Sequence, residues 1–317
     1  MRSFLSCFAS RLNDYVALRR GLGFKFHTQA ELLIQFDRFA HVQHHKGAIT
    51  AQLVMEFATS GEVSDEHQAR RYQVVRNFAE YVANFEPKTP VLDPDFLRPP
   101  RKRPVAHIYT DNELLRLLDH AKKLSRRHPI RGLTIHTIIG LGAACGLRVG
   151  EVARLDRANV DLSAGILSIC GSKFNKDRLV PVHPSTLEVL RHYAEARDAH
   201  FGDVESPAFF LTLRASRYAK TTMHQDFWLV GRAAGLRAAT GKGPRYHDLR
   251  HTFAVRRLAG WYREGRDLQA MLPVLATYMG HAHYTDTAYY LSATAELLGL
   301  ATDRFANFVG ATKGGKR

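Results

Sequence analysis

Apolar residues recur at helical spacing through the first 85 or so residues of the chain. Residues three and four positions apart share one face of a helix, so each apolar cluster predicts one amphipathic helix. The four clusters are Leu12, Tyr15 and Val16; Leu32, Leu33, Phe36 and Phe39; Leu53, Val54 and Phe57; and Val75, Phe78 and Tyr81. Together they predict a small bundle of four short helices.

A proline-rich segment interrupts this pattern. Six prolines lie between Glu86 and Val105, among the basic residues Arg98, Arg101, Lys102 and Arg103. Proline favours extended backbone at its own position and at the preceding residue, so we expect an exposed connector. The predicted organisation is a helical N-terminal domain over residues 1–88, a basic linker over 89–104, and a second domain over 105–317 that ends in a C-terminal tail.

The second domain is also predicted to be mainly helical. Thr110 and Glu113 have the spacing of a capping box at the start of a helix that contains Leu114, Leu117 and Leu118. Further helices are expected near residues 130–144, 185–198, 221–235, 246–260 and 268–280. The last predicted helix carries Leu297, Leu298, Leu300, Phe305 and Phe308.

Residues 166–182 have a different pattern, which is typical of a β-hairpin. The segments ILSIC and RLVPV are rich in β-branched and other apolar residues, and they flank the polar turn GSKFNKD. The fold class predicted for the whole chain is therefore mainly α with a small antiparallel β-sheet.

The composition indicates a globular protein with a polyanionic partner. Hydrophobic residues make up 45% of the 317 residues, and 45 Lys and Arg against 30 Asp and Glu give a formal net charge of +15. Such an excess favours nucleic acid as the partner. Cys7, Cys145 and Cys170 are far apart and form no CxxC pair, so we expect a reducing cytoplasm and no disulfide framework. The longest apolar stretch is too short to span a bilayer.

The second domain contains the residue types needed to transfer a phosphodiester. This reaction requires a nucleophile, fixed cations around the phosphate oxygens, and an acid for the departing oxygen. The candidates are Arg148 in GLRVGE, Lys173 in the predicted turn, His247 and Arg250 in YHDLRH, His281 in YMGHAH, and Tyr290 in DTAYYL. Each has an ordinary structural explanation when taken alone. Arg148, for example, could simply pair with Glu151 on a helix surface.

The order and spacing of these boxes resemble those of the tyrosine recombinases. GLRVGEVARL is similar to the first arginine box of that family, SKFNKDRLVPV to its β-hairpin lysine segment, and HDLRHTFA to its His-x-x-Arg-His box. YMGHAHYTDTAYYL resembles the Gly-His box that is followed nine residues later by the nucleophilic tyrosine. The resemblance spans roughly residues 105–300, and the preceding helical segment is similar to the core-binding domain of the family.

The resemblance implies a role for each residue. Arg148 and Arg250 would clamp the scissile phosphate, Lys173 would protonate the leaving 5′ oxygen, and His247 would assist proton transfer at the tyrosine. His281 would donate a hydrogen bond to the phosphate, and Tyr290 would form a 3′-phosphotyrosyl link. The resemblance further implies a two-domain clamp on double-stranded DNA with specific recombination sites, a tetramer as the active assembly, and no metal or other cofactor.

Two of these assignments have a neighbouring competitor, and one further histidine needs a role. Tyr289 precedes Tyr290, but the nine-residue offset from His281 favours Tyr290 as the nucleophile. Lys176 lies nearer the strand than Lys173 and is the alternative acid. His251, in the same box as Arg250, is interpreted as a packing or supporting residue.

Three other functions remain as alternatives at this point. His247 and His251 are spaced to chelate a metal, with His281, His283 or Asp286 completing the site of a hydrolase or nuclease. However, HDLRH lacks the glutamate of the helical zinc-protease motif. A DNA-binding protein that has lost its chemistry is a second alternative, although all the presumed catalytic positions are filled. A type IB topoisomerase is the third, and the compact helical N-terminal segment favours a recombinase.

Overall fold

The computed structural model describes residues 4–97, 105–171, 177–238, 243–281, 283, 285–292 and 299. The chain divides into two compact units, Met1–Arg103 and Pro104–Arg317, each with a hydrophobic core of its own. In the described residues no helix is long and apolar enough to cross a membrane. The finer division into residues 1–88, 89–104 and 105–317 stays a prediction.

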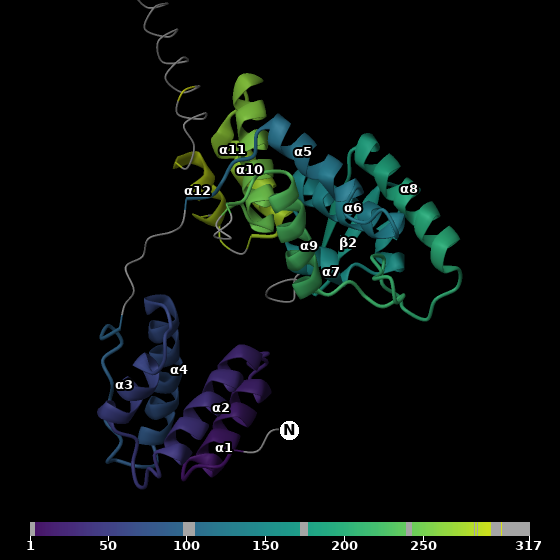
Figure 1. Cartoon of the computed structure of the whole chain (residues 1–317). Coiled ribbons are helices and arrows are strands. Elements are labelled where there is room, and N and C mark those ends of the chain that lie inside the picture. The colour runs from purple at the N-terminus through teal and green to yellow at the C-terminus, as the bar shows by residue number, and fades with distance from the viewer. Residues whose placement is uncertain are drawn as a thin grey trace, which may run out of the picture. The chain divides into compact units, whose positions relative to one another are not determined.

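The N-terminal unit contains the four helices predicted from the apolar pattern (Figure 1). They are α1 (Ala9–Gly21), α2 (His27–Val42), α3 (Ala51–Thr59) and α4 (Asp65–Ala83). Thr50 and Ser64 cap α3 and α4 through their side-chain oxygens, which satisfy backbone N–H groups that have no partner within the helix. The predicted apolar clusters face one another in a single core centred on Leu33, Phe36 and Phe78.

Part of the predicted linker packs on this unit. Leu92 joins the core of the helical bundle and is 7% exposed. The Tyr72 hydroxyl donates to the Asp93 carbonyl at 2.8 Å, and Arg76 Nε donates to the Leu92 carbonyl at 3.3 Å. The chain is therefore held to the bundle for several residues after α4 ends, whereas the sequence pattern predicted exposure throughout the segment.

The C-terminal unit is built around helix α6 (Pro129–Cys145), which packs against α5 (Asp111–Lys122), α8 (Pro184–Phe201), α9 (Lys220–Ala233) and α10 (Tyr246–Arg263). Figure 1 shows α6 between α5 and α8. The predicted capping box is present, because Thr110 and Glu113 each bond the backbone of the other at the start of α5. The short helix α7 (Val149–Arg154) follows α6, and α11 (Leu268–Met279) and α12 (Thr285–Ser292) follow α10.

The hairpin prediction is confirmed, and with it the predicted fold class. Strands β2 (Ile166–Ile169) and β3 (Arg178–Pro181) are antiparallel with Leu167 opposite Val180, and β1 (Val160–Asp161) adds a third strand in the order β1-β2-β3. Lys173 and Lys176 in the turn lie outside the described residues. So do the apolar positions of the last predicted helix.

Helices α5 and α6 approach closely at Gly132. A Cβ atom added there would lie 2.3 Å from the carbonyl oxygen of Lys122, which belongs to the backbone of α5. Backbone cannot rotate aside as a long side chain can, so the position excludes every side chain. Gly140, two turns further along α6, would meet nothing within 4 Å.

These two glycines allow a matched test of the packing around α6. Gly132→Ala should destabilise the protein by about 1–3 kcal/mol through overpacking. Gly140→Ala should stabilise it by roughly 0.5–1 kcal/mol, since alanine has the higher helix propensity. Urea unfolding followed by circular dichroism measures both changes. Equal effects of the two substitutions would show that the close approach of α5 and α6 is wrong.

Candidate active site

The structure brings together the predicted site residues that it describes. Arg148 is the N-cap of α7, His247 and Arg250 lie on α10, His281 directly follows α11, and Tyr290 lies on α12. The helices that carry them are packed together, since α12 contacts both α10 and α11. Lys173 is the one predicted catalytic residue outside the described part of the chain.

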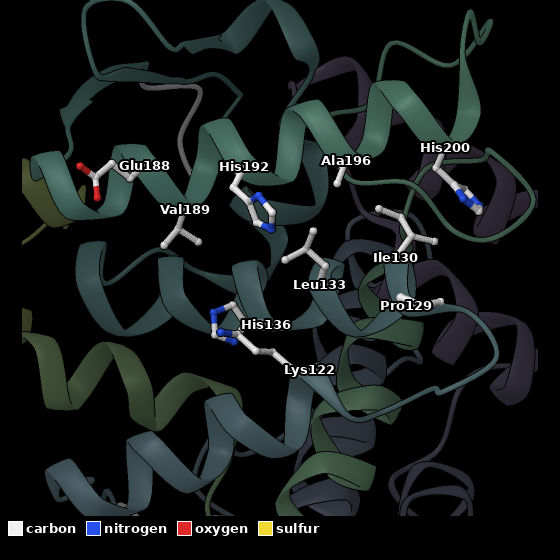
Figure 2. Close-up of a pocket in the computed structure, with 10 residues that line it drawn as sticks. All are labelled: Lys122, Pro129, Ile130, Leu133, His136, Glu188, Val189, His192, Ala196 and His200. Carbon is white, nitrogen blue, oxygen red and sulfur yellow. The ribbon is translucent and has the colours of Figure 1, made fainter.

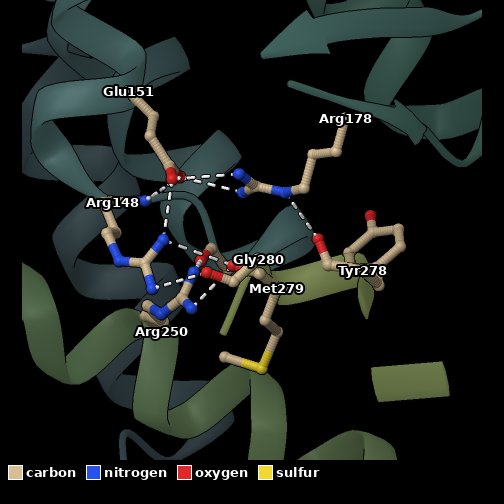
Figure 3. Close-up of polar contacts among 8 residues, drawn as sticks. Arg148, Glu151, Arg178, Arg250, Tyr278, Met279 and Gly280 are labelled. Atoms are coloured by element: carbon tan, nitrogen blue, oxygen red, sulfur yellow. Dashed lines mark hydrogen bonds and ion pairs between the residues drawn. The ribbon is translucent and has the colours of Figure 1, made fainter. Parts of the chain in front are cut away.

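Backbone carbonyls at the end of α11 hold the two arginines. Arg250 is 1% exposed and donates to the carbonyls of Gly146 and Met279 at 2.6 and 2.8 Å. Arg148 donates to the carbonyl of Gly280 at 3.0 Å and more distantly to that of Met279 at 3.5 Å. Figure 3 shows the two guanidinium groups converging on this point. The last carbonyls of a helix have no partner within it and carry partial negative charge, so cations favour this position.

A buried carboxylate completes the arrangement. Glu151 is 3% exposed, and Arg148 donates to it through its backbone N and through Nη1, both at 2.9 Å. Arg178 on β3 donates to it through both terminal nitrogens at 3.0 Å, while its Nε donates to the Tyr278 carbonyl at 2.9 Å. From the sequence, Glu151 was expected only as a surface partner of Arg148, and no role was predicted for Arg178. The feature of the sequence that could have indicated a role for Arg178 is its place as a charged residue at the start of a short apolar strand, directly after the predicted turn.

Gly280 makes room for this network. It ends α11 in the left-handed conformation with φ of 66°, which favours glycine. A Cβ atom at this position would lie 2.6 Å from the Arg178 guanidinium. The glycine therefore allows the Arg178 guanidinium to lie beside the end of α11.

The electrostatics of the site favour an anion. Burial alone would raise the pKa of Glu151, but its bonds to Arg178 and the charge of Arg148 outweigh burial and lower the pKa to about 2. Burial, together with the charge of Arg148, lowers the pKa of Arg250 to about 10. The guanidinium groups of Arg148 and Arg250 are thus held near each other. The one buried carboxylate, Glu151, pairs with Arg148 and Arg178. A phosphate would relieve the repulsion between Arg148 and Arg250.

Burial favours the neutral form of two histidines near the predicted nucleophile. Burial is the main reason that the pKa values of His247 and His281 are lowered, to about 4 and about 3, and nearby arginines add to it. His281 Nδ1 and Thr287 Oγ1 share a hydrogen bond of 2.6 Å. Tyr290 is 3% exposed, and its ring stacks on that of His281 with centres 6.2 Å apart. Burial raises the pKa of Tyr290, and the charges of Arg250 and Arg148 act in the opposite direction.

The alternative metal site is not assembled in the described residues, which include all five of its candidate ligands. No group of three His, Cys, Asp or Glu among them is placed to hold a metal ion. His247 and His251 do lie close together, with ring centres 4.8 Å apart, but their rings are perpendicular. Besides Asp248, the charged groups that act on both rings are Arg245 and Arg250, which would repel a cation.

A groove of about 700 Å³ lies elsewhere in the C-terminal unit (Figure 2). It lies between α6 and α8, with Ile130, Leu133 and His136 on the α6 side and Val189 and His192 on the α8 side (Figure 2). None of the predicted catalytic residues lines it. The convergent arginines, and not this groove, therefore mark the candidate active site.

Comparison with known proteins identifies the family. The sequence model described as "Phage integrase family" matches residues 108–296, which is more than half of the chain. The chain belongs to this family, the tyrosine recombinases. Its activity is site-specific DNA recombination by cleavage and rejoining of strands.

Relatives match the recombinase over most of its length. A protein of Sinorhizobium fredii named "Putative integrase/recombinase y4rE" is 41% identical over 304 residues, covering 96% of this chain and 97% of its own. Tyrosine recombinase XerD of Staphylococcus epidermidis is 26% identical over 260 residues and 81% of both chains.

Solved structures share the fold of the recombinase. XerH recombinase bound to its palindromic difH substrate, in a post-cleavage complex, has a TM-score of 0.65 at 18% identity and covers 88% of this chain and 79% of its own. A lambda integrase tetramer bound to a Holliday junction has a TM-score of 0.58 at 17% identity, and the match covers 89% of this chain and 76% of the integrase chain.

Replacement of the buried carboxylate tests the network. Glu151→Gln should lower the free energy of unfolding at neutral pH by about 3–5 kcal/mol, because Arg148 and Arg178 lose their buried counter-charge. The folded-state pKa lies below the ordinary value of 4.5, so the stabilisation is present above pH 4.5 and is lost as the pH falls to about 2. Urea unfolding between these pH values should therefore show a shallower pH dependence in the variant.

The control for this test is Glu188→Gln on the exposed face of α8. It should leave the free energy of unfolding within about 0.5 kcal/mol of the parent. A Glu151→Gln protein as stable as this control, with an unchanged pH dependence, would contradict the buried network.

Proposed function

We propose that the recombinase cleaves DNA by attack of the Tyr290 hydroxyl on the scissile phosphate, forming a 3′-phosphotyrosyl link and a free 5′ hydroxyl. The observation that carries the proposal is the convergence of Arg148 and Arg250 on the Met279 carbonyl, in a site where their charges act on Tyr290. A second 5′ hydroxyl reverses the step. The phosphotyrosyl link conserves the energy of the broken bond, so neither ATP nor a metal is required.

The arginines supply charge stabilisation in this mechanism. Their positions are held by backbone oxygens and by Glu151, so they need little reorganisation when charge grows on the phosphate oxygens. Arg250 already uses both terminal nitrogens on carbonyls, and a phosphate would share or replace these bonds. Guanidinium groups suit this role because their planar forks match the geometry of phosphate.

The remaining roles concern protons and orientation. Lys173 protonates the leaving 5′ oxygen, and Lys176 is the weaker candidate. His281, held by Thr287, donates a hydrogen bond to the phosphate. His247, neutral at physiological pH because burial lowers its pKa, assists at the tyrosine side.

The partner in this proposal is double-stranded DNA with specific recombination sites, and the active assembly is a tetramer. The net charge of +15 supports a DNA partner. The names of the similar structures also support it, since XerH is bound to its difH substrate and lambda integrase forms a tetramer on a Holliday junction. The helical unit would contact DNA as a core-binding domain and the C-terminal unit as the catalytic domain. Action in a reducing cytoplasm remains a prediction.

Removal of the nucleophilic hydroxyl tests the assignment of Tyr290. Tyr290→Phe should abolish covalent complex formation on a nicked suicide substrate and leave DNA affinity nearly unchanged, because the phenol acts in chemistry. Denaturing gels measure the covalent complex and fluorescence anisotropy measures binding. Tyr289→Phe is the matched control and should cleave. The reverse result would assign the nucleophile to Tyr289, and cleavage by both variants would refute the proposal.

Chemical rescue tests Lys173. Lys173→Ala should cleave ordinary DNA about two to four decades more slowly, which is the typical contribution of a general acid. A bridging 5′ sulfur leaves without protonation, so cleavage of the 5′-thio substrate should recover. Arg148→Ala and Arg250→Ala should stay impaired on both substrates because their contribution is charge stabilisation. If the 5′-thio substrate restores cleavage by Lys176→Ala and not by Lys173→Ala, the general acid is Lys176.

A further inference from the structure

His251 lies directly against the proposed nucleophile. It is on α10, one turn after His247 and next to Arg250. Its ring centre is 5.4 Å from that of Tyr290 at an interplanar angle of 63°, and it also contacts the ring of His247. Among the described histidines, His251 and His281 are therefore the two whose rings contact Tyr290.

The Nδ1 atom of His251 is buried and has no hydrogen-bond partner among the described residues. An unsatisfied buried polar atom costs about 1–3 kcal/mol, and a phenylalanine would fill the same space without that cost. A ring contact with Tyr290 alone does not explain a histidine here. The unused nitrogen indicates a group that gains its partner when DNA is bound.

Burial favours the neutral form of the His251 imidazole. Burial lowers the pKa of His251, and on its own helix Asp248 acts against this effect while Arg245 and Arg250 add to it. From the neighbouring elements, Asp286 on α12 and Arg148 act on Tyr290, and the ring of His281 stacks on it. Cations outnumber carboxylates around the ring. A neutral imidazole has one nitrogen free to accept a proton.

We propose that His251 positions Tyr290 and accepts its phenol proton at Nδ1 during strand cleavage. The O–H bond breaks as the phenol oxygen bonds to phosphorus, the proton passes to Nδ1, and the P–O5′ bond breaks with a proton supplied to O5′ by the leaving-group acid. Rejoining returns the proton to the phenol. A ring separation of 5.4 Å allows the nitrogen and the oxygen to meet after rotation of either side chain, and catalytic hydrogen bonds often form only in the substrate complex.

This inference rests on Tyr290 as the nucleophile and differs from the mechanism above in the proton acceptor. That mechanism assigned help at the tyrosine to His247. His247 reaches Tyr290 through His251, whose ring contacts both. His247 is thereby left to act on the phosphate.

The first test is His251→Phe, which keeps an aromatic ring against Tyr290 and removes both nitrogens. Covalent complex formation on the nicked suicide substrate should slow by about two to four decades, as expected for loss of a general base. The melting temperature and DNA affinity should not fall. His192→Phe on the distant helix α8 is the control and should cleave at the parental rate.

The second test separates proton transfer from simple packing. A fluorinated tyrosine at position 290 ionises at lower pH and needs no base, so the ratio of cleavage rates between the parent and the His251→Phe variant should shrink toward one. An unchanged ratio with the fluorinated nucleophile would overturn proton acceptance, and cleavage at the parental rate by His251→Phe would overturn the whole inference. If His251→Phe does not fold, His251→Gln is compared in the same way. Failure of the nucleophile assignment itself would appear separately, as cleavage by Tyr290→Phe.

Discussion

The buried carboxylate of Glu151 is the group on which the rest of the candidate active site depends. A charge removed from water costs several kcal/mol unless it is paired and fully hydrogen-bonded. Glu151 meets that demand by binding Arg148 at the start of α7 and Arg178 on β3. One carboxylate thus links the first arginine to strand β3, which the proposed acid Lys173 precedes in the sequence.

The end of α11 is the second fixed element. Its last carbonyls accept from Arg178, Arg250 and Arg148 in succession, so one helix end orients cations from three separate elements. The same helix leads directly to His281 and then to α12 with Tyr290. The three arginines and the proposed nucleophile therefore depend on the same helix, and a displacement of α11 would disturb them together.

The sequence predicted what depends on local pattern. Helical spacing predicted α1 to α6 and α8 to α11, and the β-rich segments predicted β2 and β3. Both predictions succeed because the spacing of apolar residues can be read directly along the sequence. The packing of Leu92 was not predicted, since composition alone does not show that a proline-rich segment docks. Only part of the candidate site was predicted. Boxes of residue types located Arg148, Arg250 and Tyr290, which the fold brings together, but nothing local says that Glu151 meets Arg178, 27 positions away.

Backbone oxygens bind the arginines, so the side chains of the residues that supply these oxygens can be replaced without loss of the hydrogen bonds. A substitution at Tyr278 or Met279 changes packing but leaves the carbonyl that binds the guanidinium. Gly280 has no such freedom, since both its φ and the nearby Arg178 exclude a side chain. A saturation library across 278–280 should therefore retain active members at the first two positions and almost exclusively glycine at the third.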